Sequence, residues 1–389
     1  MSHHPQLPLC KKILTDLMAF DVLGGQSNLS IIDYIKEYLT KRNIAFQLVP
    51  HQTEPKTSLH CRIGPAVDGG LILSGHTDVV PVKGQEWHTD PFVAQEVDDQ
   101  IYGRGSCDMK GFIACCLAMA DTMIETHLKK PIYFAFSYDE EIGCLAGPEL
   151  AAAILRDYTE TPQFAIIGEP SMMQPVIGHK GICVLKTTVK GSAGHSSRIR
   201  QEVSAIHVAA HLIAWLERKM ERMVELGRLD QRFHPPHSSI HVGMIHGGIA
   251  PNVIADICEF YWDIRVIPSD DVYDILNDFQ LYCREYESQL KFRFPFTQII
   301  TTEDHPPVVP LGTDDDADII PLIRSVSGNE KLGTVSYAAE AGQFSEAGFQ
   351  TVICGPGDIA QAHRANEYVA VDQLNQCLYM LDRLVSEFG

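Results

Sequence analysis

Short apolar runs closed by polar residues alternate along this chain with stretches in which apolar positions recur at helical spacing. The segments expected to be extended are 44–49, 57–63, 71–75, 131–137 and 164–168, and those expected to be helical are 8–20, 29–42, 109–126 and 147–157. Short runs that are apolar throughout are typical of strands buried on both faces of a sheet. The alternation therefore predicts an α/β fold with a mixed central sheet flanked by helices. The stretch 87–105 is rich in turn-forming residues and is expected to be a long loop.

The pattern changes after Gly181. A strand at 182–190 is followed by a helix at 202–226, strands at 239–246 and 254–266, a helix at 270–288 and a strand at 290–294. This order is typical of a small ferredoxin-like α+β unit. Because a proline-rich stretch around 305–307 then returns the chain to the first pattern, we predict a first domain of residues 1–180 and 296–389, interrupted by an inserted domain at 181–295.

Composition narrows the class of protein. The chain has 389 residues, of which 45% are hydrophobic and 21% charged, as in ordinary folded proteins. A formal net charge of −19 argues against a nucleic acid or an anionic membrane as partner. The 11 cysteines are scattered without a CxxC pair, which favours a reducing compartment. Since the N-terminus lacks the apolar core of a signal peptide and no apolar run reaches about 18 residues, we expect a cytoplasmic protein.

Residues that commonly bind metals follow four of the apolar runs. These residues are His76 and Asp78, the run Asp139-Glu140-Glu141, then Glu169, and finally His363. Ligands of α/β sheets bind beyond the carboxyl ends of the strands, so these side chains are expected to meet at one edge. Side chains two apart on a strand face the same way, which allows Asp78 to reach His76. The sequence thus predicts a metal centre.

Simpler interpretations exist for each of these residues taken alone. Asp108 precedes a helical pattern and could be an N-cap, and 139–141 could be an acidic run at a helix start. Three acids after an apolar strand are costly, however, unless cations neutralise them. Nitrogen and oxygen donors without clustered thiolates suit zinc, with cobalt or manganese as substitutes.

Motifs spread over nearly the whole chain carry a family resemblance. They read GHTDVVP, GRGSCDMKG, DEEIG, IIGEP, HKG, GHSS, PNVIAD, DIR and GPG followed by AHRANE, in this order. Together they resemble the two-zinc amidohydrolases related to aminoacylase and glutamate carboxypeptidase. The resemblance implies a zinc-hydrolase catalytic domain whose inserted domain serves as a lid and dimerisation domain.

The resemblance also implies roles for matching positions. One metal ion would be bound by His76, Asp108 and Glu169, and the other by Asp108, Glu141 and His363, so that Asp108 bridges the two. Asp78 would orient His76, and Glu140 would act as general base and then as general acid. A cis peptide is expected after Asp108. No Ser–His–Asp signature is present, and the neighbouring Cys107 is a nucleophile only on paper.

Three residues of the inserted domain are implicated in the same way. His195, in GHSS, would support the oxyanion of the tetrahedral intermediate, often from the partner subunit of a homodimer. The simpler interpretation of this loop is a helix start capped by Ser196 or Ser197. Asn252 and Arg265 match family positions that hold the carboxylate of the substrate, a task for which the planar fork of arginine is suited.

The segments IIGEPSMMQPVIGHKG, YAAEA and GPGDIAQAHRANEY are most similar to the branch of the family that deacetylates acetylornithine. The expected reaction is therefore hydrolysis of N2-acetyl-L-ornithine to L-ornithine and acetate, a step of arginine biosynthesis. Glu340, in YAAEA, is the candidate for recognising the ornithine amine. The alternatives are succinyl-diaminopimelate, a dipeptide or another N-acyl amino acid, and Arg104, Arg198 or Arg364 could receive a second carboxylate. A non-catalytic binding protein is a further alternative, against which the intact Glu140 argues.

Overall fold

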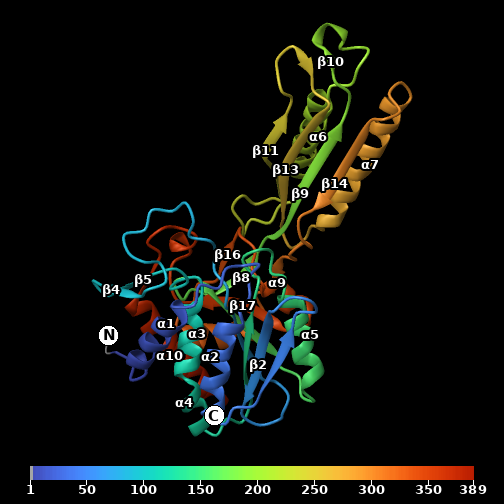
Figure 1. Cartoon of the computed structure of the whole chain (residues 1–389). Coiled ribbons are helices and arrows are strands. Elements are labelled where there is room, and N and C mark those ends of the chain that lie inside the picture. The colour runs from blue at the N-terminus through green and yellow to red at the C-terminus, as the bar shows by residue number, and fades with distance from the viewer. Residues whose placement is uncertain (1–2) are drawn as a thin grey trace. The chain divides into compact units, whose positions relative to one another are not determined.

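The computed structural model describes residues 3–389, which form two compact units. Unit 1 comprises Met1–Gly178, Leu311–Thr334 and Ala339–Gly389, and unit 2 comprises His179–Pro310 and Val335–Ala338. Figure 1 shows the elements of both units. In the part of the chain described, no helix has the length and apolar character needed to cross a membrane.

Unit 1 is built on a nine-stranded sheet. Its order is β1 (Phe46–Pro50), β2 (Thr57–Ile63), β6 (Ile132–Ser137), β3 (Leu71–His76), β7 (Phe164–Pro170), β17 (Gln350–Gly355), β8 (Val176–His179) and β15 (Leu311–Gly312), with β16 (Gly333–Val335) paired to β8. The central strands β6, β3, β7 and β17 run parallel, whereas β1–β2, β2–β6 and β17–β8 are antiparallel. The predicted mixed sheet is confirmed. Because β3, β6 and β7 are buried along their whole length, their apolar runs are continuous.

Helices cover this sheet on both sides. They are α1 (Leu7–Met18), α2 (Leu29–Thr40), α3 (Lys110–Ala118), α4 (Ala120–Glu125), α5 (Gly147–Asp157), α8 (Ile319–Ser327), α9 (Ala341–Glu346) and α10 (Val371–Phe388), with a 3-10 turn η2 at Ile359–Gln361. Every residue of α3 is buried, since the helix packs on the sheet beneath α1 and α10. The single helix expected at 109–126 is in fact divided between α3 and α4.

The stretch expected to be a loop at 87–105 contains two short strands. β4 (Gln95–Val97) and β5 (Gln100–Tyr102) form a hairpin, and β18 (Tyr368–Ala370) pairs with β5. The turn consists of Asp98 and Asp99, both with positive φ, as a two-residue type I′ hairpin turn requires. This small sheet ties the segment before Asp108 to the segment after His363.

Unit 2 has the predicted βαββαβ order. Its elements are β9 (Gly181–Lys190), α6 (Ala205–Glu225), β11 (Ser239–Gly247), β13 (Ile257–Val266), α7 (Val272–Lys291) and β14 (Gln298–Glu303), with the short pair β10 (Gly194–His195) and β12 (Val253–Ile254) and the 3-10 turn η1 (Ser196–Arg198). The sheet order is β11-β13-β9-β14 and all pairings are antiparallel. This is the topology of a ferredoxin-like unit.

The strand expected at 290–294 is wrong. α7 runs on to Lys291, and Leu290 and Phe294 pack against the core of unit 2, so the alternating apolar residues there belong to a helix end and a turn. The sixth strand is β14, which pairs with β9. Unit 2 consequently extends to Pro310, whereas the boundary expected from the sequence fell at 295.

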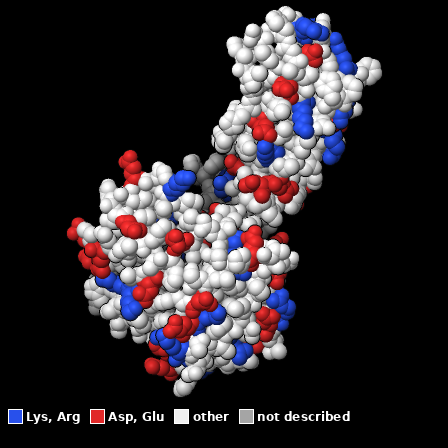
Figure 2. Space-filling view, viewed as in Figure 1, with Lys and Arg blue, Asp and Glu red and all other residues white. Residues whose placement is uncertain are grey.

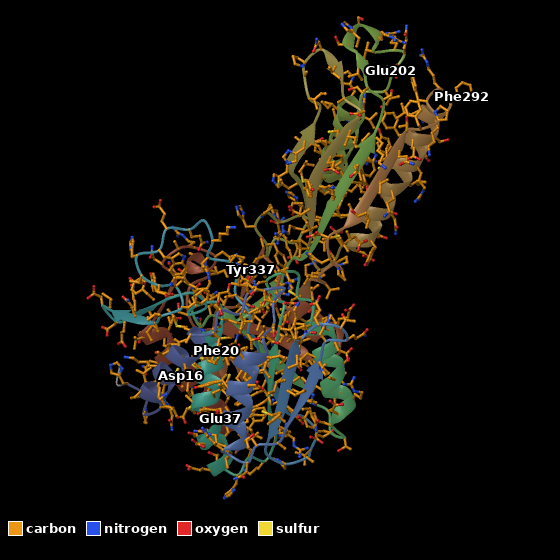
Figure 3. All side chains as sticks on the ribbon, in the orientation of Figure 1. Asp16, Phe20, Glu37, Glu202, Phe292 and Tyr337 are labelled. Carbon is orange, nitrogen blue, oxygen red and sulfur yellow. The ribbon has the colours of Figure 1, made fainter. Side chains whose placement is uncertain are left out.

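Each unit has its own hydrophobic core. In unit 2, Trp262 of β13 packs edge-on against Phe279 of α7, with ring centroids 4.8 Å apart, and donates its indole N–H to Thr187. At the end of α7, Phe292 extends into solvent and is 97% exposed (Figure 3). On the visible face of unit 1, acidic and basic side chains are interspersed (Figure 2).

Candidate metal centre

His76 is the last residue of β3 and is buried. Its Nδ1 lies 2.9 Å from the backbone carbonyl of Asp78 and 3.6 Å from the carboxylate of the same residue. Its Nε2 lies 3.1 Å from Oδ1 of Asp108 and 3.8 Å from Oε1 of Glu169. The Asp78 side chain was expected to orient His76, but the backbone carbonyl of Asp78 makes the shorter contact. Since Nδ1–H donates to that carbonyl, Nε2 is left as the ligating atom.

Asp108 presents one carboxylate oxygen to each of two histidines. Oδ1 faces Nε2 of His76 at 3.1 Å, and Oδ2 faces Nε2 of His363 at 3.5 Å. The peptide bond between Asp108 and Met109 is cis, as expected. Asp108 does not cap α3, whose N-cap is Met109 without a side-chain hydrogen bond. The arrangement suits a carboxylate that bridges two cations.

The acidic run 139–141 follows β6 and is fixed from two sides. Asp139 has a positive φ of 55°, and its carboxylate accepts from Lys56 Nζ at 2.7 Å and from the backbone N–H of Gly25 at 2.8 Å. The carboxylate of Asp78 accepts the backbone N–H groups of Glu140 and Glu141, each at 3.2 Å. Asp78 therefore holds the acidic run as well as His76, which spacing alone did not suggest.

Glu169 and His363 belong to segments on the other side of β3 from the acidic run: Glu169 lies on β7, and His363 follows β17. Glu169 is the penultimate residue of β7 and is buried. His363 has a positive φ of 61°, and its Nε2 lies 3.0 Å from Oε2 of Glu141. The two strands that carry these segments, β7 and β17, are paired in parallel. The carboxyl ends of parallel strands thus collect residues that lie far apart in the sequence.

The carboxylates of this cluster are buried close together, so their negative charges repel one another and a bound cation would stabilise them. Burial raises the pKa of Glu140 and of Glu169 well above its usual value, and neighbouring carboxylates add to both shifts. Burial and the Asp108 charge raise the pKa of Glu141 to about 7. Burial acts against ionisation of Asp108 too, but hydrogen bonds from His363 and His76 outweigh it and lower its pKa. Like charges this close are unfavourable unless a cation neutralises them.

The donor set fits a pair of divalent cations. His76, Glu140 and Glu169 offer ligand atoms that lie within 4.8 Å of one another, and so do His76, Asp108 and Glu141. Imidazole nitrogen and carboxylate oxygen without thiolates are the donors of catalytic zinc and related sites. Cys107, the one thiol beside Asp108, is buried, donates to the Asp358 carbonyl at 3.3 Å, and has its pKa raised by burial. It is therefore unsuited to act as a nucleophile.

Glu340 lies in unit 1 at the start of α9 and is buried. Its Oε2 accepts from the hydroxyl of Ser137, the last residue of β6, at 2.9 Å. Its Oε1 has no hydrogen-bond partner among the described residues, and burial raises the pKa of Glu340 to about 7. A buried carboxylate oxygen left unpaired is costly and is suited to receive a cationic group.

The three implicated residues of unit 2 lie at two ends of its sheet. His195 and Asn252 are neighbours, since β10 pairs with β12 and the Ser196 N–H donates to the Asn252 carbonyl at 3.0 Å. Nδ1 of His195 accepts from the backbone N–H of Ser197 at 3.2 Å, which leaves the proton of the neutral ring on Nε2. Neither Ser196 nor Ser197 caps α6, whose N-cap is Ser204.

Arg265 lies near the far end of β13 from Asn252. Arg265 pairs with Ser239 and Ile182, whereas the first residue of β13, Ile257, pairs with Lys190. Arg265 lies eight steps along the strand from Ile257, which is about 26 Å at a rise of about 3.3 Å per residue. Within unit 2, Asn252 and Arg265 are thus not brought together.

Three contacts around the site were not predicted from the sequence. Glu367, which ends the AHRANE motif, accepts hydrogen bonds from the backbone of the segment around Asp108. Arg104, considered as a receptor for a second substrate carboxylate, is instead buried against Glu367 at 2.6 Å. Glu367 could have been noticed in its motif, whereas nothing local to Lys56 signals that it binds Asp139.

Two histidines and several buried acids, collected at the carboxyl ends of parallel strands, are typical of a metallohydrolase. The chain belongs to peptidase family M20/M25/M40, whose model matches residues 72–387. It is accordingly an enzyme, a hydrolase of amide bonds.

Among its curated relatives, an acetylornithine deacetylase from Myxococcus xanthus is 32% identical over 98% of this chain and 98% of its own length. An M20 family metallo-carboxypeptidase from Sulfolobus solfataricus has the same fold, with a TM-score of 0.78 and 17% identity over 97% of this chain and 99% of the other. The Bacillus subtilis YXEP protein, described as a dinuclear metal binding peptidase, has a TM-score of 0.65 and 15% identity over 99% of both chains.

Proposed function

We propose that the chain hydrolyses N2-acetyl-L-ornithine to L-ornithine and acetate with two divalent metal ions, zinc in the first place and cobalt as a substitute. One ion would be held by His76, Asp108 and Glu169, and the other by Asp108, Glu141 and His363. The observation that carries this proposal is the position of Asp108, whose two oxygens face Nε2 of two different histidines. The name shared by curated relatives at 32% identity supports the substrate.

Bound there, the ions would polarise the substrate carbonyl and lower the pKa of a water molecule. Glu140 has an elevated pKa because of burial, which suits a residue that takes up a proton and later releases it. We assign it the task of accepting a proton from the attacking water and passing it to the leaving amine. The Asp78 carboxylate accepts from the Glu140 backbone N–H and so fixes the backbone of that residue.

We further propose roles in substrate binding for four residues. Nε2–H of His195 is a free donor for the developing oxyanion, and Asn252 and Arg265 are the proposed ligands of the α-carboxylate. Glu340 is the proposed partner of the ornithine ammonium, because its Oε1 is buried without a partner among the described residues. The succinyl alternative loses one of its three candidate cations, since Arg104 is engaged by Glu367.

We also propose that the enzyme acts as a homodimer through unit 2 and that it resides in a reducing compartment, the cytoplasm. Free and buried thiols at all eleven cysteine positions support the second point.

The test is a kinetic comparison on enzyme of defined zinc content. We expect the highest kcat/KM for acetylornithine, followed by acetylmethionine, with succinyl-diaminopimelate lowest. In Glu340→Gln the preference for acetylornithine over acetylnorvaline should fall by about 10-fold or more, the size of one lost charge pair. A wild-type preference for the succinyl substrate would refute the acetylornithine assignment. An unchanged ratio in the variant would refute only the role of Glu340.

A further inference from the structure

Glu367 is the most completely paired carboxylate close to the metal centre. Its Oε1 accepts from the backbone N–H groups of Cys107, at 2.9 Å, and Asp108, at 3.1 Å. Its Oε2 accepts from the backbone N–H of Gly105, at 3.1 Å, and from Nη1 of Arg104, at 2.6 Å. The side chain of Glu367 is 0% exposed and that of Arg104 is 1% exposed. Charge-assisted bonds of this kind are short and strong, so the carboxylate fixes the backbone from Gly105 to Asp108.

A second arm of the same network reaches His363. Nη2 of Arg104 donates to Oε1 of Gln85 at 2.7 Å, and Nε2 of Gln85 donates to the backbone carbonyl of His363 at 2.9 Å. The indole N–H of Trp87 also donates to Gln85 at 3.1 Å, and the Arg104 guanidinium lies 5.1 Å from the Trp87 ring centroid. His363 needs such support because it sits in a left-handed backbone conformation and its side chain is 59% exposed.

We propose that Glu367 is the positioning residue that sets Asp108 and His363 in register with one another for two cations. One arm acts directly on the backbone of Asp108, and the other runs through Arg104 and Gln85 to the backbone of His363. This inference rests on the metal centre proposed above. It adds that the spacing of the two ligands is set by one buried carboxylate that binds no metal itself.

The arms can be separated by substitution. Glu367→Gln replaces an acceptor oxygen with an amide that faces backbone N–H groups, and it removes the charge opposite Arg104. Gln85→Ala removes only the arm to His363 and leaves the four hydrogen bonds of Glu367. Glu160→Gln is the matched control in the same unit, because Glu160 is also a buried partner of an arginine, Arg62 at 2.5 Å, but no contact ties it to the metal-site residues.

The measurement is titration of apoprotein with Zn²⁺ against a chelator, with Co²⁺ absorption spectra as a second readout. We expect Glu367→Gln to lower the affinity for both ions by about 10–100-fold, as the loss of a group that orients metal ligands does. Gln85→Ala should lower the affinity for one ion by about 10-fold and leave the affinity for the other within about 2-fold of wild type. Glu160→Gln should bind both ions as wild type does, even where its Tm falls as far as that of Glu367→Gln.

Failure of the inference is distinguishable from failure of the proposed function. If wild type does not bind two Zn²⁺ ions, the metal centre itself is refuted. If wild type binds two and Glu367→Gln has the same two affinities, or loses them only as much as Glu160→Gln does, the positioning role is overturned. Should Glu367→Gln not fold, Gln85→Ala decides the matter, and equal affinities of both ions for that variant and wild type refute the second arm.

Discussion

Glu140 differs from its acidic neighbours in what its side chain touches. The carboxylates of Asp108, Glu141 and Glu169 each lie within 3.8 Å of a histidine Nε2. The carboxylate of Glu140 instead accepts a hydrogen bond from the thiol of Cys144 at 3.3 Å. A carboxylate with a weak neutral donor keeps its basicity, and burial raises the pKa of Glu140 further. An oxygen of Glu140 also lies within 4.8 Å of ligand atoms of His76 and Glu169, but the shorter imidazole contacts belong to the three acids proposed as ligands.

Glu140→Ala should therefore leave metal binding intact and remove turnover. We expect kcat to fall by roughly 10²–10⁴-fold, the usual contribution of general acid–base catalysis. His363→Ala is the contrasting variant, since it should lose one ion while the His76 side of the centre still binds the other. Metal content by elemental analysis and acetate release measure the two effects. Undiminished kcat in the Glu140 variant would exclude it as the base.

At the scale of single residues, the sequence predicts what is local and misses what is distant. His76, Asp139 and Glu169 could be recognised because each ends an apolar run, and strand ends meet at one edge. The bond between Lys56 and Asp139 joins positions 83 residues apart, and no periodicity announces it. The same holds for Glu367, which organises a backbone segment about 260 residues earlier in the chain.

The elements that carry the site depend on close approaches that only glycine permits. Gly168 of β7 precedes Glu169, and a methyl group at that position would overlap the ring of Phe112. Phe112 lies in α3, which begins two residues after Asp108. The distance between the strand bearing Glu169 and the helix following Asp108 is therefore limited by one missing side chain.

Gly168→Ala should push α3 and β7 apart. We expect a loss of about 1–3 kcal/mol in the free energy of unfolding, as overpacking of a core generally costs, and weaker binding of Zn²⁺. Gly243→Ala is the control, because its added Cβ would meet nothing closer than 3.6 Å and its φ is not positive. Urea denaturation and zinc titration are the measurements. Equal free energies of unfolding for the two variants would show that α3 shifts to accommodate the added methyl group without destabilising the fold.

Helices and strands were predicted correctly where helical spacing of apolar residues continued over several turns or where a run was apolar throughout. The helices at 29–40 and 147–157 and the strands β3, β6 and β7 lie close to their expected ranges. The break between α3 and α4 was not predicted, because apolar residues continue at helical spacing across it. In the segment 290–294 apolar residues alternate as in a strand, but the end of α7 and its turn use them for packing. Tertiary packing there overrides a local pattern.

At the scale of the whole molecule, the two proposed carboxylate ligands in unit 2 argue for more than one copy. Arg265 lies about 26 Å along β13 from Ile257, the end of the strand that follows the segment of Asn252. One small carboxylate cannot bind both within a single unit 2. If both residues serve one substrate, a second copy of the chain must supply one of them.

Unit 2 also has an edge through which two copies could pair. β11 is the outermost strand of its sheet, and Met244 and Ile245 on it are about half exposed, while Ile249 beyond it is 89% exposed. An uncovered edge strand with apolar side chains is a template for another strand. Pairing of β11 with its own copy would give the closed twofold symmetry that most homodimers have.

The double variant Met244→Asp, Ile245→Asp should therefore be monomeric. Charges placed on both strands of a symmetric pair repel each other, so light scattering should report the mass of one chain where wild type shows two. Because His195 and Asn252 would no longer reach a partner, kcat should fall while zinc content stays at two ions. Phe292→Asp is the control, since Phe292 is 97% exposed in the same unit but lies at the end of α7, away from β11. A wild-type monomer with full activity, or an active monomeric variant, would contradict the shared site.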